Sequence, residues 1–359
     1  MKVGILGSGN GATAAAFDWA NAGHDVYVFD FEQFPKNIEA MNKNQGVYCE
    51  GQLEGFAKIK YAGFDIEKVV TDADLILAIG PAYSTEAFGK ACKPHLKKGQ
   101  VVIVCPSSCG GAIVFKNAAG LDIKSEDIII AETSTLPYAA RVTSPGKVKI
   151  FLKVKDGIFV AALPGRRTGK VMDLVKDVYP AMVPAKNVLQ TTMQNGNPVI
   201  HPSVMLLNAA AIERTEGELY FYEEGVTPAV GKLMKGVDQE RIALGKKLGV
   251  DIIPDPELGY RQGYMYNNTY DVGFSKSQGF KGIKAPKTLD DRYFNEDVGY
   301  GLVFMSELGK QIGVATPVID SIICLASLIM ERDYRKEKAR TMESMGFGQY
   351  SLEELNQIL

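Results

Sequence analysis

The chain offers three histidines for acid–base chemistry, and their sequence contexts differ. His24 lies in a turn between two apolar segments, and His95 follows a proline near the end of a predicted helix. His201 instead precedes Pro202 and a long apolar helical pattern. Because proline favours the first helical position, we expect His201 at about the N-cap, on a rigid support that suits a general acid or base. A purely structural histidine is the alternative.

A second group of functional side chain types stands in the acidic and aromatic segment from Asp290 to Asp297. Arg292 carries a planar guanidinium, which can hold a substrate carboxylate through two parallel hydrogen bonds. An aspartate such as Asp297 can stand behind a histidine and fix its tautomer. The same composition is also typical of a solvated charged turn, which is the alternative interpretation.

The amino-terminal segment carries a glycine motif in the setting of a dinucleotide-binding fold. The apolar run Lys2–Leu6 predicts a buried strand. It leads into the pattern G-x-G-x-x-A, which contributes Gly7, Gly9, Asn10, Gly11 and Ala12. Such a motif supplies a tight turn, a close approach of the backbone to a pyrophosphate, and close packing of helix on strand. The following helix presents free N–H groups to the phosphate charge. A merely glycine-rich turn is the alternative.

Asp30 ends the second predicted strand, Asp25–Phe29, where an acidic residue binds the ribose hydroxyls of a dinucleotide. A carboxylate there repels the 2′-phosphate of NADP, and residues 31–34 contain no Arg or Lys to bind that phosphate. We therefore expect NAD (NADH) as cofactor, with NADP less favoured. Farther on, Gly80-Pro81-Ala82 predicts a turn at the carboxyl edge of the sheet. The backbone at Pro81 would there run alongside the cofactor. An ordinary turn is an equal alternative.

The order of apolar segments predicts an α/β fold: a Rossmann-type, doubly wound sheet followed by a mostly helical domain. Helical patterns alternate with short apolar runs at Lys2–Leu6, Asp25–Phe29, Leu75–Ile79, Val101–Val104 and Ile128–Ala131. This alternation makes βαβ units and a mainly parallel sheet. Val148–Val154 and Ile158–Leu163 flank Asp156-Gly157, a hairpin turn signal, so we expect them to pair as an antiparallel edge.

The pattern changes after about residue 185, where strand signals give way to helical spacing. We therefore expect an NAD-binding domain over residues 1–185 and an all-helical substrate and catalytic domain over residues 186–359. Residues 255–295 are rich in Tyr, Gly, Asn and Asp and predict an irregular segment with short helices. Segments of this kind inside a compact domain usually carry function.

Composition argues against several classes of protein. The chain of 359 residues has 40 Lys+Arg against 42 Asp+Glu, so it lacks the basic excess that nucleic-acid binding needs. No apolar run reaches the roughly 18 residues of a membrane span, and we expect no signal peptide. Five cysteines then predict reduced thiols in the cytoplasm, and with three histidines and no suitable cysteine spacing we expect no metal site.

Together these features resemble the opine dehydrogenases, the octopine/nopaline dehydrogenase family, over nearly the whole chain. Besides the glycine motif, the resemblance rests on Glu132-Thr133-Ser134, Asn195–Pro202, Leu207–Ala210, Tyr222–Pro228, Val237–Arg241 and Arg292–Val303. It implies a reductive condensation, in which an amino acid and an α-keto acid such as pyruvate form an imine that NAD(P)H reduces to a secondary amine. The same enzyme would catalyse the reverse oxidation.

The resemblance also assigns roles to individual residues. It implies that His201 is the acid/base, that Asp297 orients it, and that Arg292 binds the carboxylate of the keto acid. The site would lie between the two domains. Glu132 joins the cofactor-binding residues on the same basis. The expected partners are these small-molecule substrates, with no nucleic acid and no membrane, and a homodimer is left open. Relatives that take arginine use acidic and thiol groups near residues 132–141, and residues 136–140 offer no thiol, which favours an apolar amino acid.

Two other readings of the chain differ in their chemistry. Enzymes like 2-ketopantoate reductase or glycerol-3-phosphate dehydrogenase resemble the amino-terminal half but use a catalytic lysine in the helical domain. Here Lys232 and Lys235 lie on an ordinary amphipathic helical face. A non-enzymatic, NAD-responsive protein is the second alternative, and the combination of His201, Arg292 and Asp297 argues against it.

Overall fold

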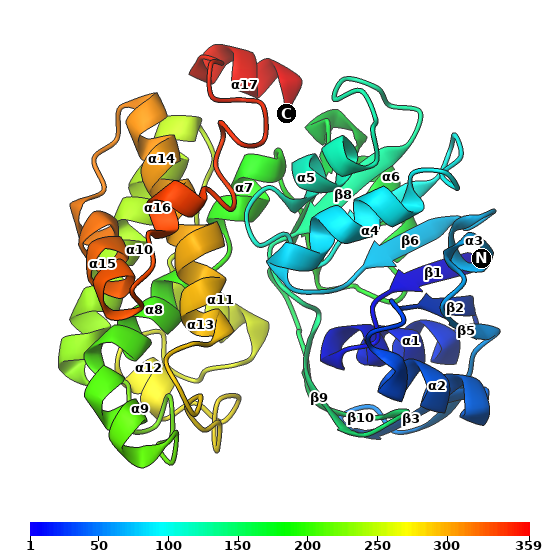
Figure 1. The fold of residues 1–359 in the computed structure, drawn as a ribbon, viewed down its shortest axis with the longest axis horizontal. Coiled ribbons are helices and arrows are strands. Elements are labelled where there is room, and N and C mark those ends of the chain that lie inside the picture. Colours follow the sequence, from blue (N-terminus) through cyan, green and yellow to red (C-terminus); the bar gives the residue numbers. More distant parts are fainter. The chain divides into compact units, whose positions relative to one another are not determined.

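The computed structural model describes all residues from Met1 to Leu359, which form two compact units, Met1–Thr191 and Thr192–Leu359 (Figure 1). The first unit contains both β-sheets, and the second is built from helices. None of the helices is both long and apolar enough to cross a membrane.

An eight-stranded sheet forms the centre of the first unit, in the order β12-β11-β8-β7-β6-β1-β2-β5. Its strands are β1 (Lys2–Leu6), β2 (Asp25–Phe29), β5 (Tyr61–Gly63), β6 (Leu75–Ala78), β7 (Val101–Val104), β8 (Ile129–Thr133), β11 (Ile158–Leu163) and β12 (Met182–Pro184). All pairs are parallel except β11 with β8. The central strands β6 and β7 are buried along their whole length, as in a sheet covered by helices on both faces. The predicted α/β Rossmann-type sheet is confirmed.

The helices of this unit connect consecutive strands. They are α1 (Asn10–Asn21), α2 (Pro35–Asn44), α3 (Ile66–Val70), η1 (Ala82–Ser84), α4 (Thr85–Cys92), α5 (Gly111–Ala118), η2 (Gly165–Arg167) and α6 (Thr168–Val175). Helix α7 (Val188–Met193) crosses the boundary between the units at residue 191. Helix α1 is rich in alanine, and Ala12, Ala14, Ala15 and Ala16 are completely buried. Small side chains let this helix pack closely on the strands around it.

A second, four-stranded sheet packs on the other side of α1 (Figure 1). Its order is β4-β3-β10-β9, from β3 (Gly46–Gly51), β4 (Gly55–Lys58), β9 (Tyr138–Ser144) and β10 (Lys147–Lys153). The predicted hairpin of Val148–Val154 with Ile158–Leu163 is wrong. Strand β10 pairs with β9 and β3, whereas β11 enters the large sheet.

The physical reason for this difference is the position of the tight turn. Lys147 pairs directly with Ser144, so Pro145-Gly146 is a two-residue hairpin loop, with Gly146 at φ 77°. Only glycine adopts such a conformation without strain. The chain also bends at Asp156, before Gly157 at φ 72°, but there it passes from one sheet to the other.

The second unit is helical, as predicted for the carboxyl-terminal half. It contains α8 (Asn197–Leu207), α9 (Ala209–Thr215), α10 (Pro228–Leu248), α11 (Asp255–Gln262), α12 (Val272–Ser275), α13 (Arg292–Asn295), the π-helical segment η3 (Asp297–Leu302), α14 (Val303–Ile312), α15 (Pro317–Ile329), α16 (Tyr334–Glu337) and α17 (Leu352–Ile358). Its longest helix, α10, begins where Thr227 accepts a hydrogen bond from the Val230 N–H. It ends at Gly249, which is left-handed at φ 71°.

A fully buried arginine holds α10 to the segments that precede α8 and α11. Arg241 Nε donates to Asp238 Oδ1 over 2.7 Å, and Nη2 donates to the Ile253 carbonyl over 2.9 Å. Asp238 Oδ2 accepts from the Asp255 N–H over 2.9 Å and from the Tyr270 hydroxyl over 2.6 Å. Because a buried charge is costly unless it is paired, this network fixes the geometry of the surrounding chain.

The network places a second carboxyl group beside Gly196, the N-cap residue of α8. A Cβ on Gly196 would lie only 1.7 Å from Asp255 Oδ1, so a larger residue there would have to displace the Asp255 carboxyl. Burial, and next the charge of Asp238, raise the pKa of Asp255 to about 7. Asp238 binds the guanidinium directly, whereas the charge of Arg241 only opposes the rise in the pKa of Asp255.

The first prediction concerns the stability of this unit as a function of pH. A folded-state pKa above the unfolded value means that the folded protein binds more protons, so the free energy of unfolding falls as pH rises. The fall should extend from about pH 4, where an unfolded aspartate titrates, to about pH 7. Asp255→Asn should lessen the loss of thermal stability between pH 5 and pH 8, measured by differential scanning fluorimetry. The exposed Asp251→Asn is the control, and an equal pH dependence in all three proteins would contradict the prediction.

Candidate functional site

His201 lies inside helix α8 rather than at its N-cap, so the predicted position is wrong. The helix begins at Asn197, with Pro198 in its first turn and Gly196 as its N-cap. Pro198, not Pro202, therefore takes the early helical position that proline favours. Pro202 stands within the helix, where it lacks the N–H that would bond to the Pro198 carbonyl.

His201 and Asp297 form a buried pair across 96 positions of sequence. His201 Nδ1 lies 2.7 Å from Asp297 Oδ2, and the two side chains are only 6% and 4% exposed. Asp297 opens the π-helical segment η3, a kind of turn that is frequent at functional sites. Since a carboxylate only accepts, it binds the Nδ1–H and leaves Nε2 as the nitrogen that can exchange a proton.

Two tyrosines that the sequence analysis did not single out complete the surroundings of this imidazole. The Tyr222 hydroxyl lies 3.1 Å from His201 Nε2, and burial raises the pKa of Tyr222 well above its usual value. Tyr293 stacks on the imidazole, with ring centroids 3.9 Å apart and an interplanar angle of 20°. In the sequence, these tyrosines stand beside Arg292 and at the start of segment 222–228. Composition alone does not tell which aromatic ring contacts the histidine.

Arg292 stands next to this pair with its charge accessible. Its side chain is 53% exposed, its Nε lies 3.5 Å from Glu296 Oε2, and its guanidinium carbon is 5.8 Å from the Tyr293 ring centroid. Partial burial opposes its charge, but Glu296 and Asp297 outweigh that effect and raise the pKa of Arg292. The structure thus brings His201, Asp297 and Arg292 together, with a positive group at the surface of a buried acid–base pair.

In the first unit, the glycines of the motif have different structural tasks. Gly7 has φ 107°, and a Cβ there would lie 2.3 Å from the Ile79 carbonyl oxygen, so the turn requires glycine. Gly11 faces the Leu136 side chain, which would be 3.0 Å from a Cβ. Gly9 has no atom within 4 Å of a Cβ position, which leaves room for a ligand at the start of α1.

The loop around these glycines is held by side chains on neighbouring elements. Ser8 Oγ donates to Asp30 Oδ2 over 2.6 Å, and Asp30 Oδ1 accepts from the Phe31 N–H over 2.8 Å. Burial raises the pKa of Asp30, and these hydrogen bonds oppose the shift. Asn10 Oδ1 accepts from the Val142 N–H of β9 over 2.8 Å, so the small sheet supports the loop. Helix α1 has no side-chain cap, which keeps its first N–H groups available.

The two other residues predicted to bind the cofactor lie at the ends of β6 and β8. Pro81 precedes η1, and its carbonyl accepts from Ser84 Oγ over 2.7 Å. Glu132 is completely buried; its Oε2 accepts from the Ala112 N–H in the first turn of α5 over 2.8 Å, and its Oε1 from Thr191 Oγ1 over 2.5 Å. The Glu132 carboxylate therefore stabilises the start of a helix within the protein.

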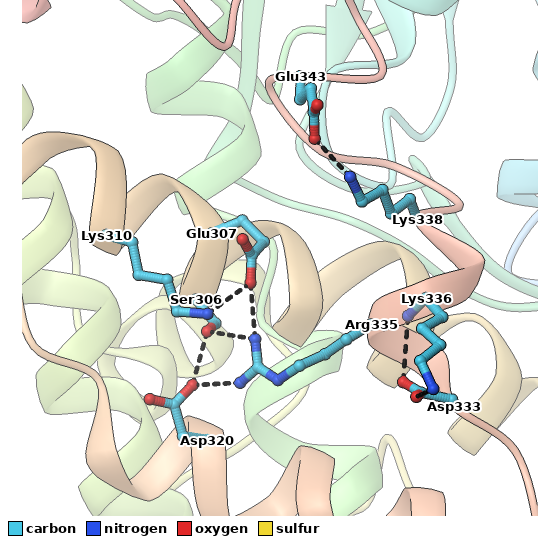
Figure 2. Close-up of polar contacts among 9 residues, drawn as sticks. All are labelled: Ser306, Glu307, Lys310, Asp320, Asp333, Arg335, Lys336, Lys338 and Glu343. Atoms are coloured by element: carbon cyan, nitrogen blue, oxygen red, sulfur yellow. Dashed lines mark hydrogen bonds and ion pairs between the residues drawn. The ribbon is translucent and has the colours of Figure 1, made fainter.

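A charged cavity of about 1050 Å³ lies elsewhere in the second unit. Figure 2 shows how its cations face carboxylates. Arg335 Nη1 lies 2.7 Å from Glu307 Oε1 and Nη2 lies 2.5 Å from Asp320 Oδ1, which joins α14, α15 and α16. The lysines are paired likewise, as Lys310–Glu307, Lys336–Asp333 and Lys338–Glu343. This cluster therefore links helices, and its lining includes none of the three predicted catalytic residues. No group of three or more His, Cys, Asp or Glu side chains is placed to hold a metal ion.

Comparison with known proteins places this geometry in context. The model of a family described as NAD/NADP octopine/nopaline dehydrogenase, alpha-helical domain, matches residues 184–330. The opine dehydrogenase of Arthrobacter sp. (strain 1C) is 34% identical over 344 residues, which cover 95% of this chain and 94% of that protein.

Two solved structures have the same fold. The structure of octopine dehydrogenase in complex with NADH and agmatine matches with a TM-score of 0.79 at 18% identity, over 99% of this chain and 97% of that one. The NADP⁺-bound structure of yersinopine dehydrogenase matches with a TM-score of 0.75 at 18% identity, over 100% of this chain and 97% of that one.

The second prediction separates the two ends of the glycine motif. Gly9 has φ −72°, an ordinary value, so Gly9→Ala should keep the thermal midpoint of the protein. The added methyl group would occupy the space that a pyrophosphate needs, so the Kd for NADH, measured by fluorescence titration, should rise about tenfold or more. Gly7→Ala is the contrasting variant and should lower the thermal midpoint. Unchanged NADH binding by folded Gly9→Ala protein would contradict this assignment.

Proposed function

The chain belongs to the opine dehydrogenase family, and on that premise we propose that it condenses an α-keto acid with the amino group of an L-amino acid. The imine is reduced at the expense of NADH, and the product is an N-(carboxyalkyl) amino acid. The enzyme also catalyses the reverse oxidation at the CH–NH group. The observation that carries this proposal is the buried His201–Asp297 pair with Arg292 beside it.

His201 is the acid–base group of the proposed reaction. The condensation needs a base to free the amino group of its proton and an acid to protonate the hydroxyl that leaves as water. His201 Nε2 can do both, because Asp297 holds Nδ1–H and stabilises the imidazolium when Nε2 is protonated. Burial of the pair strengthens that electrostatic support.

Arg292 holds the carboxylate of the keto acid. Its guanidinium is charged and half exposed, and it lies close enough to the dyad for Asp297 to raise its pKa. A two-pronged hydrogen bond to a carboxylate fixes the orientation of the attached carbonyl. In this way the carbon that reacts is presented to the acid–base group in one geometry.

The first unit binds the cofactor, which supplies the hydride. Its residues fit a dinucleotide, because Gly9 leaves open space at the uncapped start of α1 and Asp30 stands at the end of β2. Asp30 accepts hydrogen bonds from the ribose hydroxyls and disfavours a 2′-phosphate, so NADH is preferred to NADPH. The cofactor site is also shaped by the other motif residues, Gly7, Asn10, Gly11 and Ala12. At its border, Pro81 forms the turn after β6 and Glu132 stabilises the start of α5.

A lysine-dependent reductase is disfavoured as a second function. Lys232 and Lys235 are both exposed on α10, away from any buried acid–base partner.

The exposed apolar side chains and the free cysteines bear on the oligomeric state of the enzyme and on its cellular compartment. Exposed Leu325, Leu328 and Ile329 on α15 offer an apolar face that suits a homodimer, and five free cysteines suit the reducing cytoplasm.

A matrix of substrates tests the proposed function. α-Keto acids, beginning with pyruvate, are combined with apolar, charged and polar L-amino acids, and the oxidation of NADH and NADPH is followed by absorbance. Activity must require both substrates, and mass spectrometry must find the secondary amine. Faster reaction with NADPH would overturn the cofactor preference, and consumption of NADH with the keto acid alone would indicate a simple hydroxy-acid dehydrogenase.

The third prediction concerns the dyad. His201→Ala should lower kcat by about 10²–10⁴-fold, the range for a positioned proton-transfer group. Asp297→Asn should lower kcat as well, because an amide cannot stabilise the imidazolium. NADH binding should persist in both variants, as checked by fluorescence titration. His95→Ala is the matched control, and full turnover by folded His201→Ala protein would exclude this mechanism.

The fourth prediction separates binding from turnover. Arg292→Ala removes a charge-assisted hydrogen bond worth about 1.5–3 kcal/mol, so KM for the keto acid should rise about 10–100-fold. KM for the amino acid should change far less. Arg261→Ala, which removes an exposed arginine paired with Glu257, is the control. Equal increases in both KM values would argue against a specific contact with the keto acid.

A further inference from the structure

The phenol of Tyr222 occupies the position through which His201 must exchange its proton. Asp297 Oδ2 lies 2.7 Å from His201 Nδ1, and the Tyr222 hydroxyl lies 3.1 Å from His201 Nε2. Tyr293 covers a face of the same imidazole. His201 and Tyr222 are only 5% and 4% exposed. A proton that leaves Nε2 therefore meets the Tyr222 oxygen first.

The Tyr222 ring is held in place by aromatic neighbours. It stacks on Phe280, with centroids 4.3 Å apart and an interplanar angle of 16°, and meets Phe221 edge-on at 5.1 Å. Phe280 in turn stacks on Tyr264, with centroids 5.2 Å apart. Such packing restricts the ring, so the hydroxyl is held at His201 Nε2.

We propose that Tyr222 is a catalytic proton relay, which passes protons between His201 Nε2 and the reacting nitrogen and oxygen of the substrates. The inference rests on the proposed function, because it assigns a residue to that reaction. A phenol suits the task since its oxygen accepts a hydrogen bond from Nε2–H and its O–H donates to neutral Nε2. The imidazole thus keeps a partner in both of its protonation states.

The relay operates twice in one turnover, with protons in balance. First, the ammonium group of the amino acid gives one proton to the Tyr222 oxygen, while the Tyr222 proton moves to His201 Nε2. The free amine attacks the keto carbon, so that the C–N bond forms as the C=O π bond breaks, and one proton of the attacking nitrogen moves to the oxygen to give the carbinolamine hydroxyl. Then His201 returns its proton through Tyr222 to that hydroxyl. The C–O bond breaks, water leaves, and the nitrogen electron pair makes the C=N bond that accepts the hydride.

The environment of Tyr222 requires that it act with His201 and not alone. Burial, and next the nearby Tyr293, raise the pKa of Tyr222 well above its usual value, so a free tyrosinate is strongly disfavoured. A relay avoids this species, because the phenol receives one proton as it gives up another. The positive charge rests on the imidazole, where Asp297 stabilises it.

The fifth prediction tests the relay with Tyr222→Phe, which keeps the stacked ring and removes the hydroxyl. With a substrate pair that is active in the wild-type enzyme, kcat should fall about 10–100-fold, toward the lower end of the effect of a proton-transfer group. The solvent deuterium isotope effect on kcat should rise, because proton transfer becomes the slow step. KM for NADH and the thermal midpoint should stay near the wild-type values. Tyr264→Phe, in the same aromatic stack, is the control and should keep normal turnover.

Other outcomes have distinct meanings. A kcat within twofold of wild type and an unchanged isotope effect in Tyr222→Phe would overturn the relay and show that the hydroxyl only fills the substrate position. If this variant folds poorly, 3-fluorotyrosine at position 222 keeps the ring and hydroxyl but lowers the phenol pKa, and an unchanged pH profile of kcat would equally overturn the relay. Failure of the wild-type enzyme on every substrate pair, or full activity in His201→Ala, would refute the proposed function itself.

Discussion

The 2.7 Å hydrogen bond between His201 and Asp297 is the constraint around which the helical unit is arranged. A carboxylate that is 4% exposed would be strongly destabilising without a partner. His201, the partner of this carboxylate, lies on α8, whereas Asp297 lies in the π-helical segment η3 that follows α13. The two segments are far apart in sequence, so the bond requires α8 and η3 to be packed against each other.

A second buried ionic network lies behind the same helix. Arg241 binds Asp238 and two backbone carbonyls, and Asp238 holds the start of α11 through the Asp255 N–H. The Asp255 carboxyl then packs against Gly196, the residue from which α8 begins. The position of His201 along α8 thus depends on a network that never touches the imidazole. Such support would hold the proposed acid–base group in a defined geometry.

The sequence predicted those parts of the molecule that follow from local patterns. The parallel strands, the glycine turn and the helical half have strong periodicity or motif signals, and the structure contains them. The errors arise where two signals compete: Pro198 displaced Pro202 as the early helical proline, and Pro145-Gly146 formed the hairpin expected at Asp156-Gly157. Nonlocal contacts left no local signal, and for this reason neither Tyr222 at His201 Nε2 nor the support of Asn10 by β9 could be predicted.

The protonation chemistry of the dyad also explains why a histidine suits this reaction better than a lysine. The condensation must remove a proton from an ammonium group and later return one to a leaving hydroxyl, so the group must hold and release a proton with comparable ease near neutral pH. Lys232 and Lys235 lie exposed on α10, and an ammonium group offers donors only, as a compact point charge. In the proposed reaction, an imidazole with one nitrogen fixed on a carboxylate and the other on a phenol would perform both steps and return to its starting state.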